Sequence, residues 1–145
     1  MKRSMHSNFI IVRGRGLSRH VGEGYALVSE APISFFGGVD PRTGRIVEPG
    51  HPLEGVCVSG RVLVYPYGKG STVGAYVLYQ MSKLGTAPRA IVNVESDHVT
   101  IVGCIISELP LVDRLELNPM DLIRSGDYVL VDGVRGVVKI FREHG

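Results

Sequence analysis

The chain has 145 residues, of which 44% are hydrophobic and 21% charged, a balance typical of one globular domain rather than of a disordered chain. The net charge of +2 is too small to indicate nucleic-acid binding, and no apolar run has the length of a membrane span or of a secretory signal. We therefore expect a single cytoplasmic domain over residues 1–145, with no nucleic-acid or membrane partner. The 21 valines favour a strand-rich fold.

Two strands are predicted near the start of the chain, over residues 8–14 and 22–29, because both segments are short and apolar. Residues 30–55 are rich in glycine and proline and predict a long loop. Loops of this length in a compact domain are usually binding loops or disordered. Phe35 and Phe36 argue against disorder, since apolar side chains seek burial, and at least one of them is expected to anchor the loop on the core.

A strand–helix–strand unit is predicted next. Residues 60–65 alternate apolar and other side chains and indicate a strand, and residues 88–94 indicate another. Between them, residues 72–84 carry apolar side chains at helical spacing, at Val73, Val77, Met81 and Leu84. Two strands joined by a helix in this way are expected to run parallel.

The pattern over residues 96–108 fits a helix capped by Ser96, but its β-branched run fits a strand equally well, and the sequence leaves both possibilities open. Residues 109–113 predict a short strand, and Pro119 opens a polar turn.

The end of the chain predicts a β-hairpin. Residues 127–131 and 134–140 alternate, and Asp132 and Gly133 between them form a strong turn signal. The fold class is therefore α/β, with strands dominating and two or three helices, and we expect the sheet to close as a β/β/α barrel-like domain.

Gly68-Lys69-Gly70-Ser71, between the predicted strand and helix, is the strongest candidate site. The glycines allow a sharp turn and a close approach to a ligand, and the N–H groups at a helix start attract anions. Ser71 would lie at that electropositive end, with Lys69 beside it. The alternatives are that Ser71 only caps the helix, that the glycines only form a turn, and that Lys69 is only solvated. The spacing does not match a nucleotide-binding P-loop.

Metal chemistry is not expected from this chain alone. Cys57 and Cys104 lack the spacing of a metal or redox motif, and the five histidines are scattered. We expect both thiols to be buried in a reducing compartment.

The first 20 residues carry five cations and no acid. Lys2 and Arg3 are interpreted as solvated, whereas contacts with an acidic substrate or partner remain open for Arg13, Arg15 and Arg19.

Three separated motifs, taken in order, resemble the small swivel subunit of the aconitase X family: residues 33–44, residues 68–71 and residues 109–113. The resemblance is strongest over residues 22–113. The chain most resembles archaeal members of the family, in which the small subunit is a separate chain.

The resemblance implies a two-chain hydro-lyase of a mevalonate-pathway variant that makes isoprenoids. In the family, a large partner subunit carries an iron–sulfur cluster, here expected as 4Fe–4S, and one iron acts as Lewis acid on the leaving hydroxyl. The motif implies that Ser71 is the proton acceptor and that Lys69 supports it. The implied reaction converts (R)-5-phosphomevalonate to trans-anhydromevalonate 5-phosphate. The implied substrate-binding residues are Gly37, Gly38, Asp40, Gly68, Gly70 and Thr72.

Two other functions stay open, the small subunit of a related hydroxyproline dehydratase and a non-catalytic binding module. After the serine, family members often carry small residues such as Cys-Ser, where this chain has Thr72 and Val73. A phosphorylated substrate needs cations, and candidates are Arg13, Arg15, Arg42 and Lys69.

The mean hydropathy of +0.16 predicts an apolar face that binds the large subunit and allows self-association when the chain is alone. Residues 35–40 are expected at the mouth of the same cleft as Ser71.

Overall fold

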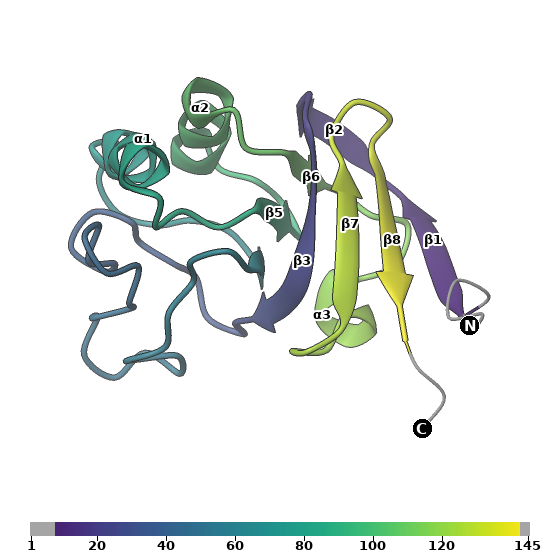
Figure 1. Cartoon of the computed structure of the whole chain (residues 1–145), viewed down its shortest axis with the longest axis horizontal. Helices are drawn as coiled ribbons and strands as arrows, with labels where there is room; N and C mark the ends of the chain where they lie inside the picture. Colours follow the sequence, from purple (N-terminus) through teal and green to yellow (C-terminus); the bar gives the residue numbers. More distant parts are fainter. Residues whose placement is uncertain (1–7, 143–145) are drawn as a thin grey trace.

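The computed structural model describes residues 8–142, so Lys2 and Arg3 lie outside the described residues. Within this range, eight strands form one sheet in the order β1-β8-β7-β3-β4-β5-β6-β2 (Figure 1). The strands are β1 (Phe9–Arg13), β2 (Arg15–Ser18), β3 (Val21–Val28), β4 (Val62–Tyr65), β5 (Ala90–Asn93), β6 (Leu111–Asp113), β7 (Tyr128–Asp132) and β8 (Val137–Phe141). The helices are α1 (Gly74–Leu84), α2 (His98–Ser107) and α3 (Pro119–Leu122). None of the helices in this part of the chain has the length and apolar character that a membrane crossing needs.

The sheet closes on itself at Gly14. β1 pairs with β8 and β2 pairs with β6, both antiparallel, and only Gly14 separates β1 from β2 along the chain. Because β1 and β2 occupy the two ends of the strand order, this one bent segment joins both edges of the sheet. A methyl group on Gly14 would lie 2.5 Å from the carbonyl oxygen of Asp113, so the bend requires glycine. The predicted α/β class and barrel-like closure are confirmed.

The centre of the sheet is parallel. β3, β4, β5 and β6 pair in sequence order, and α1 and α2 form the connections from β4 to β5 and from β5 to β6. The predicted strand–helix–strand unit is therefore confirmed. In Figure 1, α1 and α2 lie next to each other, beside the long loop that joins β3 to β4, and α3 lies near the start of β7.

Two hydrophobic cores lie on opposite faces of these parallel strands, because successive side chains of a strand point to opposite faces. In β4, Leu63 and Tyr65 belong to the core that also takes up α1, α2 and the long loop. Val62 and Val64 belong to the core of the barrel interior, shared with β7, β8 and the end of α3. All four side chains are fully buried. Burial of each such aliphatic side chain contributes about 1.5–3 kcal/mol, which makes β4 the best anchored support for the loop that follows it.

Residues 96–108, left open between helix and strand, form α2. Its N-cap is Asp97 and not Ser96, because the Asp97 carboxylate accepts the Thr100 N–H at 3.2 Å. α2 packs directly against α1 and buries Thr100, Gly103 and Cys104. Three apolar side chains of the run stay exposed, namely Val102, Ile105 and Ile106. The other predicted helix, α1, begins at Gly74, two residues after Thr72.

The hairpin of β7 and β8 is confirmed, but its turn differs from the prediction. Asp132 pairs with Val137, so the connection runs over residues 133–136 instead of the dipeptide Asp132-Gly133. The Asp132 carboxylate stabilises this longer turn by accepting the N–H groups of Val134 and Arg135. β2 and the short helix α3 were not predicted.

Candidate active site

The carboxyl ends of the four parallel strands lie at one edge of the sheet, and this edge holds the candidate site. Ligands of open α/β sheets bind outside the carboxyl ends of the strands. The segments that leave this edge are 29–38 after β3, 66–73 after β4, 94–97 after β5 and 114–118 after β6. The Gly-Lys-Gly-Ser loop is therefore brought next to the long loop and to the start of α2.

Backbone contacts hold the Gly-Lys-Gly-Ser loop against the long loop. Gly68 pairs with Ile33 in a parallel bridge, and the Lys69 N–H donates to the Ile33 carbonyl at 3.0 Å. Gly70 has a φ of +92°, and a methyl group there would lie 2.5 Å from Ser34 Oγ. The predicted turn is confirmed, and the group that Gly70 approaches in this structure is Ser34, so the close approach to a ligand stays a prediction.

Ser71 is exposed and lies just before α1. Its Oγ accepts the Val73 N–H at 3.1 Å, and its carbonyl accepts the Gly74 N–H at 2.9 Å, a tight turn that leads into the helix. This is a turn contact and not a cap, because the N-cap of α1 is Val73 and no side chain caps this helix, so the alternative that Ser71 only caps α1 is not supported. A backbone N–H aimed at Oγ also stabilises negative charge on that oxygen, and the exposed side chain leaves it accessible to a substrate.

Lys69 is not merely solvated. Its Nζ lies 2.8 Å from Oε2 of Glu48 on the long loop, and the two side chains are 44% and 28% exposed. An ion pair this accessible contributes about 1 kcal/mol at most, so it ties the two loops only weakly. The ammonium is directed at Glu48 here, so support of Ser71 by Lys69 stays a prediction.

The glycines of the long loop have structural reasons of their own. Gly37 is exposed with a φ of +84°, a conformation that favours glycine. Gly38 is buried, and a methyl group there would overlap the Ser34 carbonyl. The Phe36 N–H lies 3.4 Å from where a methyl group on Gly74 would be. This part of the long loop is therefore a neighbour of the segment that carries Ser71, and the expected cleft shared by residues 35–40 and Ser71 stays a prediction.

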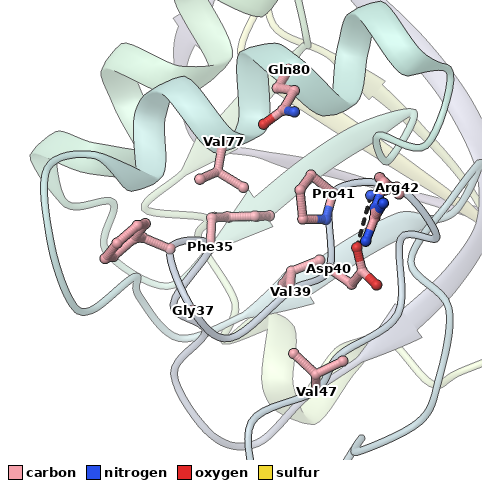
Figure 2. Close-up of a pocket in the computed structure, with 10 residues that line it drawn as sticks. Phe35, Gly37, Val39, Asp40, Pro41, Arg42, Val47, Val77 and Gln80 are labelled. Carbon is pink, nitrogen blue, oxygen red and sulfur yellow. Dashed lines mark hydrogen bonds between the residues drawn. The ribbon is translucent and has the colours of Figure 1, made fainter.

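A cavity of about 480 Å³ lies between α1 and the long loop (Figure 2). Phe35 is 2% exposed and lies toward Val77 of α1, which confirms that one of the two phenylalanines anchors the loop (Figure 2). Asp40 also lines the cavity, and its carboxylate accepts the Arg42 N–H at 2.9 Å. Ser71 and the exposed Thr72 do not line it. Gly37 and Asp40 thus share this cavity, while Ser71 lies beside it instead of inside it. The lining residues are Phe35, Phe36, Gly37, Val39, Asp40, Pro41, Arg42, Val47, Val77 and Gln80.

A chain of partly buried hydrogen bonds joins four strand ends at the same edge. Asp113 accepts two hydrogen bonds from the Arg15 guanidinium, at 2.9 and 2.8 Å, and the Ser96 N–H at 2.8 Å. Ser96 Oγ donates to Asn93 Oδ1 at 2.8 Å, and the Asn93 amide donates to the Tyr65 carbonyl at 3.1 Å. The motif at residues 109–113 therefore ends in the carboxylate that organises this edge. Sequence reasoning missed this network, although a polar Asn93 at the end of an apolar strand signals it.

Replacing Asp113 with asparagine is expected to lower the free energy of unfolding by about 1.5–3 kcal/mol at pH 7, because its carboxylate accepts hydrogen bonds from a charged partner. Burial raises the pKa of Asp113, but the hydrogen bonds from Arg15 and Ser96 outweigh it, and the pKa is lowered overall. This stabilisation is present above the unfolded value of about 3.9 and is lost as the pH falls through the lower folded pKa. Urea unfolding of both proteins as a function of pH measures it, and a difference between them that does not shrink in acid would contradict this assignment.

The fold and this edge define a swivel domain. Residues 11–140 match the family model of the aconitase X swivel domain, and the chain belongs to this family. The match reaches beyond residues 22–113 and includes the closing strands and the hairpin. In three dimensions, the chain is similar to the crystal structure of Thermococcus kodakaraensis aconitase X in its holo-form, with a TM-score of 0.86 and 38% identity, covering 92% of this chain and 99% of that one.

The names of similar proteins point to a particular enzyme within this family. The phosphomevalonate dehydratase small subunit of Methanosarcina mazei is 51% identical over 131 residues, which cover 90% of this chain and 91% of the relative. The protein of the same name from Pyrococcus furiosus is 44% identical over 132 residues, which cover 91% of this chain and 96% of the relative.

Proposed function

We propose that this chain is the small subunit of a phosphomevalonate dehydratase, which removes water from (R)-5-phosphomevalonate to give trans-anhydromevalonate 5-phosphate. The observation that carries the proposal is an accessible Ser71, set before α1 in the Gly-Lys-Gly-Ser loop, in a chain 51% identical to a subunit of that name. The relatives' names favour this substrate over a hydroxyproline.

Ser71 serves as proton acceptor. Its oxygen, as the alkoxide, takes the proton from the substrate carbon between the carboxylate and the hydroxyl-bearing carbon. The electrons of that C–H bond form the double bond, and the hydroxyl leaves with its own bonding pair. It departs as water once it takes up the proton that Ser71 accepted, which restores the alkoxide. The Val73 N–H, 3.1 Å from Ser71 Oγ, stabilises the negative charge before the transfer.

Of the cations considered for the phosphate, Arg15 and Lys69 are already paired with carboxylates. Arg13 and Arg42 remain, and we assign Arg42 as the phosphate contact because it lines the cavity with Gly37 and Asp40.

A large subunit completes the site. Three exposed side chains close to Ser71 in the sequence and one from the neighbouring long loop form what we call the apolar rim: Tyr67, Val73 and Tyr76, with Phe36. They are 45–69% exposed, although apolar surface seeks burial. An exposed base also needs a cover that excludes water during proton transfer. A partner seated on the apolar rim meets both needs.

The 4Fe–4S cluster is assigned to the partner, because the thiols of this chain do not fit it. Burial raises the pKa of the Cys104 thiol, which is fully enclosed in the core, and Cys57 Sγ donates to the Thr43 carbonyl. In residues 8–142 no three acidic, histidine or cysteine side chains gather as a metal site would require. Both thiols are free, which supports a cytoplasmic location.

The isolated chain is expected to be colourless and inactive, and to gain activity when it is combined anaerobically with the large subunit encoded by the same organism. Phosphorus NMR of the reaction mixture follows conversion of (R)-5-phosphomevalonate to the anhydro product. An iron–sulfur absorption band in the purified single chain after reconstitution would contradict the division of labour. A combined pair that leaves this substrate unchanged would overturn the proposed function.

A further inference from the structure

We propose that Asp97 is a positioning residue for the reaction: its carboxylate holds the Gly68 N–H and so fixes the loop that presents Ser71. The inference rests on the proposed role of Ser71. Asp97 does not touch the substrate in this scheme, and it acts only through the backbone of the Gly-Lys-Gly-Ser loop.

One carboxylate serves two elements. Oδ2 of Asp97 accepts the Thr100 N–H at 3.2 Å, which caps α2. Oδ1 accepts the Gly68 N–H at 2.7 Å, a shorter bond that reaches across 29 residues of sequence to the loop. An ordinary N-cap needs only the first of these bonds, so the second indicates a role beyond capping.

The loop lies flat on the start of α2, and glycine at position 68 makes this possible. A methyl group on Gly68 would lie 2.6 and 2.8 Å from the two carboxylate oxygens of Asp97 and 2.7 Å from Thr100 Oγ1. Any side chain there would push the loop away from α2. Gly68 therefore has a reason in this chain's own packing, besides any contact with a substrate.

Asp97 itself is held on a rigid base. The preceding residue, Ser96, is fixed through its N–H by Asp113 and through its hydroxyl by Asn93. On the other side, Thr100 is fully buried and its Oγ1 lies 2.9 Å from the hydroxyl of Tyr65, the last residue of β4. These contacts fix the position of the Asp97 carboxylate relative to β4, β5 and β6. A displacement of about 1 Å at a reacting group lowers a rate by up to about a hundredfold, so this anchoring matters for the reaction.

Asp97→Ser separates the two bonds. Serine is a preferred N-cap, so its hydroxyl restores the bond to the Thr100 N–H, but a single short oxygen cannot also reach Gly68. In the enzyme reconstituted with its large subunit, we expect a nearly unchanged melting temperature, a kcat lowered about 10- to 100-fold and little change in KM. Gly68→Ala is expected to lower kcat in the same way, because its methyl group collides with the Asp97 carboxylate and displaces the loop.

Asn118→Ala is the matched control. Asn118 caps α3 by accepting the Met120 N–H at 2.9 Å, the same kind of bond, without a link to the loop. This variant is expected to lose some thermal stability and to keep its kcat. Loss of a cap alone is thereby separated from loss of the loop anchor.

Amide hydrogen exchange of the isolated full-length chain tests the anchor without turnover. The Gly68 amide is expected to exchange at least about tenfold faster in Asp97→Ser than in the wild type, while the Thr100 amide stays protected. The positioning role alone is overturned if the wild-type pair turns over phosphomevalonate and kcat is unchanged in both Asp97→Ser and Gly68→Ala. It is also overturned if the wild-type pair is active and the Gly68 amide exchanges at an unchanged rate in Asp97→Ser. A wild-type pair that does not turn over phosphomevalonate overturns the proposed function and the catalytic role of Asp97 with it.

Discussion

Ser71→Gly is expected to leave the chain folded and bound to its large subunit while lowering turnover of (R)-5-phosphomevalonate by roughly a hundredfold or more. The variant removes the one oxygen assigned to accept the proton. Ser71 precedes Val73, the N-cap of α1, and is exposed, so glycine there removes one turn hydrogen bond worth about 0.5–1.5 kcal/mol and leaves the fold intact. Single-turnover measurements under anaerobic conditions report the proton-transfer step directly.

The rival role of Ser71 is the turn before α1, where its Oγ accepts the Val73 N–H. If that were its only role, Ser71→Ala would lose this one hydrogen bond, at a cost of about 0.5–1.5 kcal/mol of stability, and the folded protein would remain active. Ser34→Ala is the control, because it removes a hydroxyl that packs against Gly70 in the same loop pair. We expect Ser34→Ala to keep most of the activity. Lys69→Met should slow turnover less than Ser71→Gly, since the N–H groups at the helix start remain. Turnover by Ser71→Gly at the wild-type rate would end the assignment.

The part of the fold that could be predicted depends on local pattern. β4, α1 and β5 each carry their own periodicity, and the short connections between them permit only a parallel pair. The Gly-Lys-Gly-Ser loop was found for the same reason, since it interrupts two regular patterns. Which of two neighbouring residues caps a helix was harder to predict. Ser96 and Asp97 are both good caps, and Ser96 is diverted because Asp113 binds its N–H and Asn93 binds its hydroxyl.

The part that could not be predicted depends on distant partners. Arg15, Gly16, Leu17 and Ser18 show no alternation, and they form β2 only because β6 offers an edge, with an irregular register between Gly16 and Ser18. The two hydrogen bonds from Arg15 to Asp113 link residues 98 apart in the sequence. The pairing of Lys69 with Glu48 has the same origin. Such contacts depend on the tertiary arrangement, so the order of residues does not reveal which partners meet.

Tyr76→Ala is expected to weaken binding of the large subunit roughly 30-fold or more, which corresponds to about 2 kcal/mol. Tyr76 is 69% exposed in the first turn of α1, and Val73 lies just before that turn. Large tyrosines at the centre of an interface contribute much of the binding free energy, because they bury apolar area at a low cost in conformational entropy. Calorimetric titration of the large subunit into this chain measures the change in Kd.

Tyr25→Ala is the matched control, because Tyr25 is also highly exposed, at 60%, but belongs to β3 beside β7. Its ring contacts that of Tyr128, with 4.9 Å between centroids, so the control loses a similar area and a ring contact away from Ser71. We expect the Kd of Tyr25→Ala to stay within about threefold of the wild type. If the apolar rim also mediates self-association, Tyr76→Ala should shift the isolated chain toward the monomer in sedimentation experiments, and Tyr25→Ala should not. Equal affinities of the two variants for the large subunit would place the partner on another face and would leave Ser71 without its proposed cover.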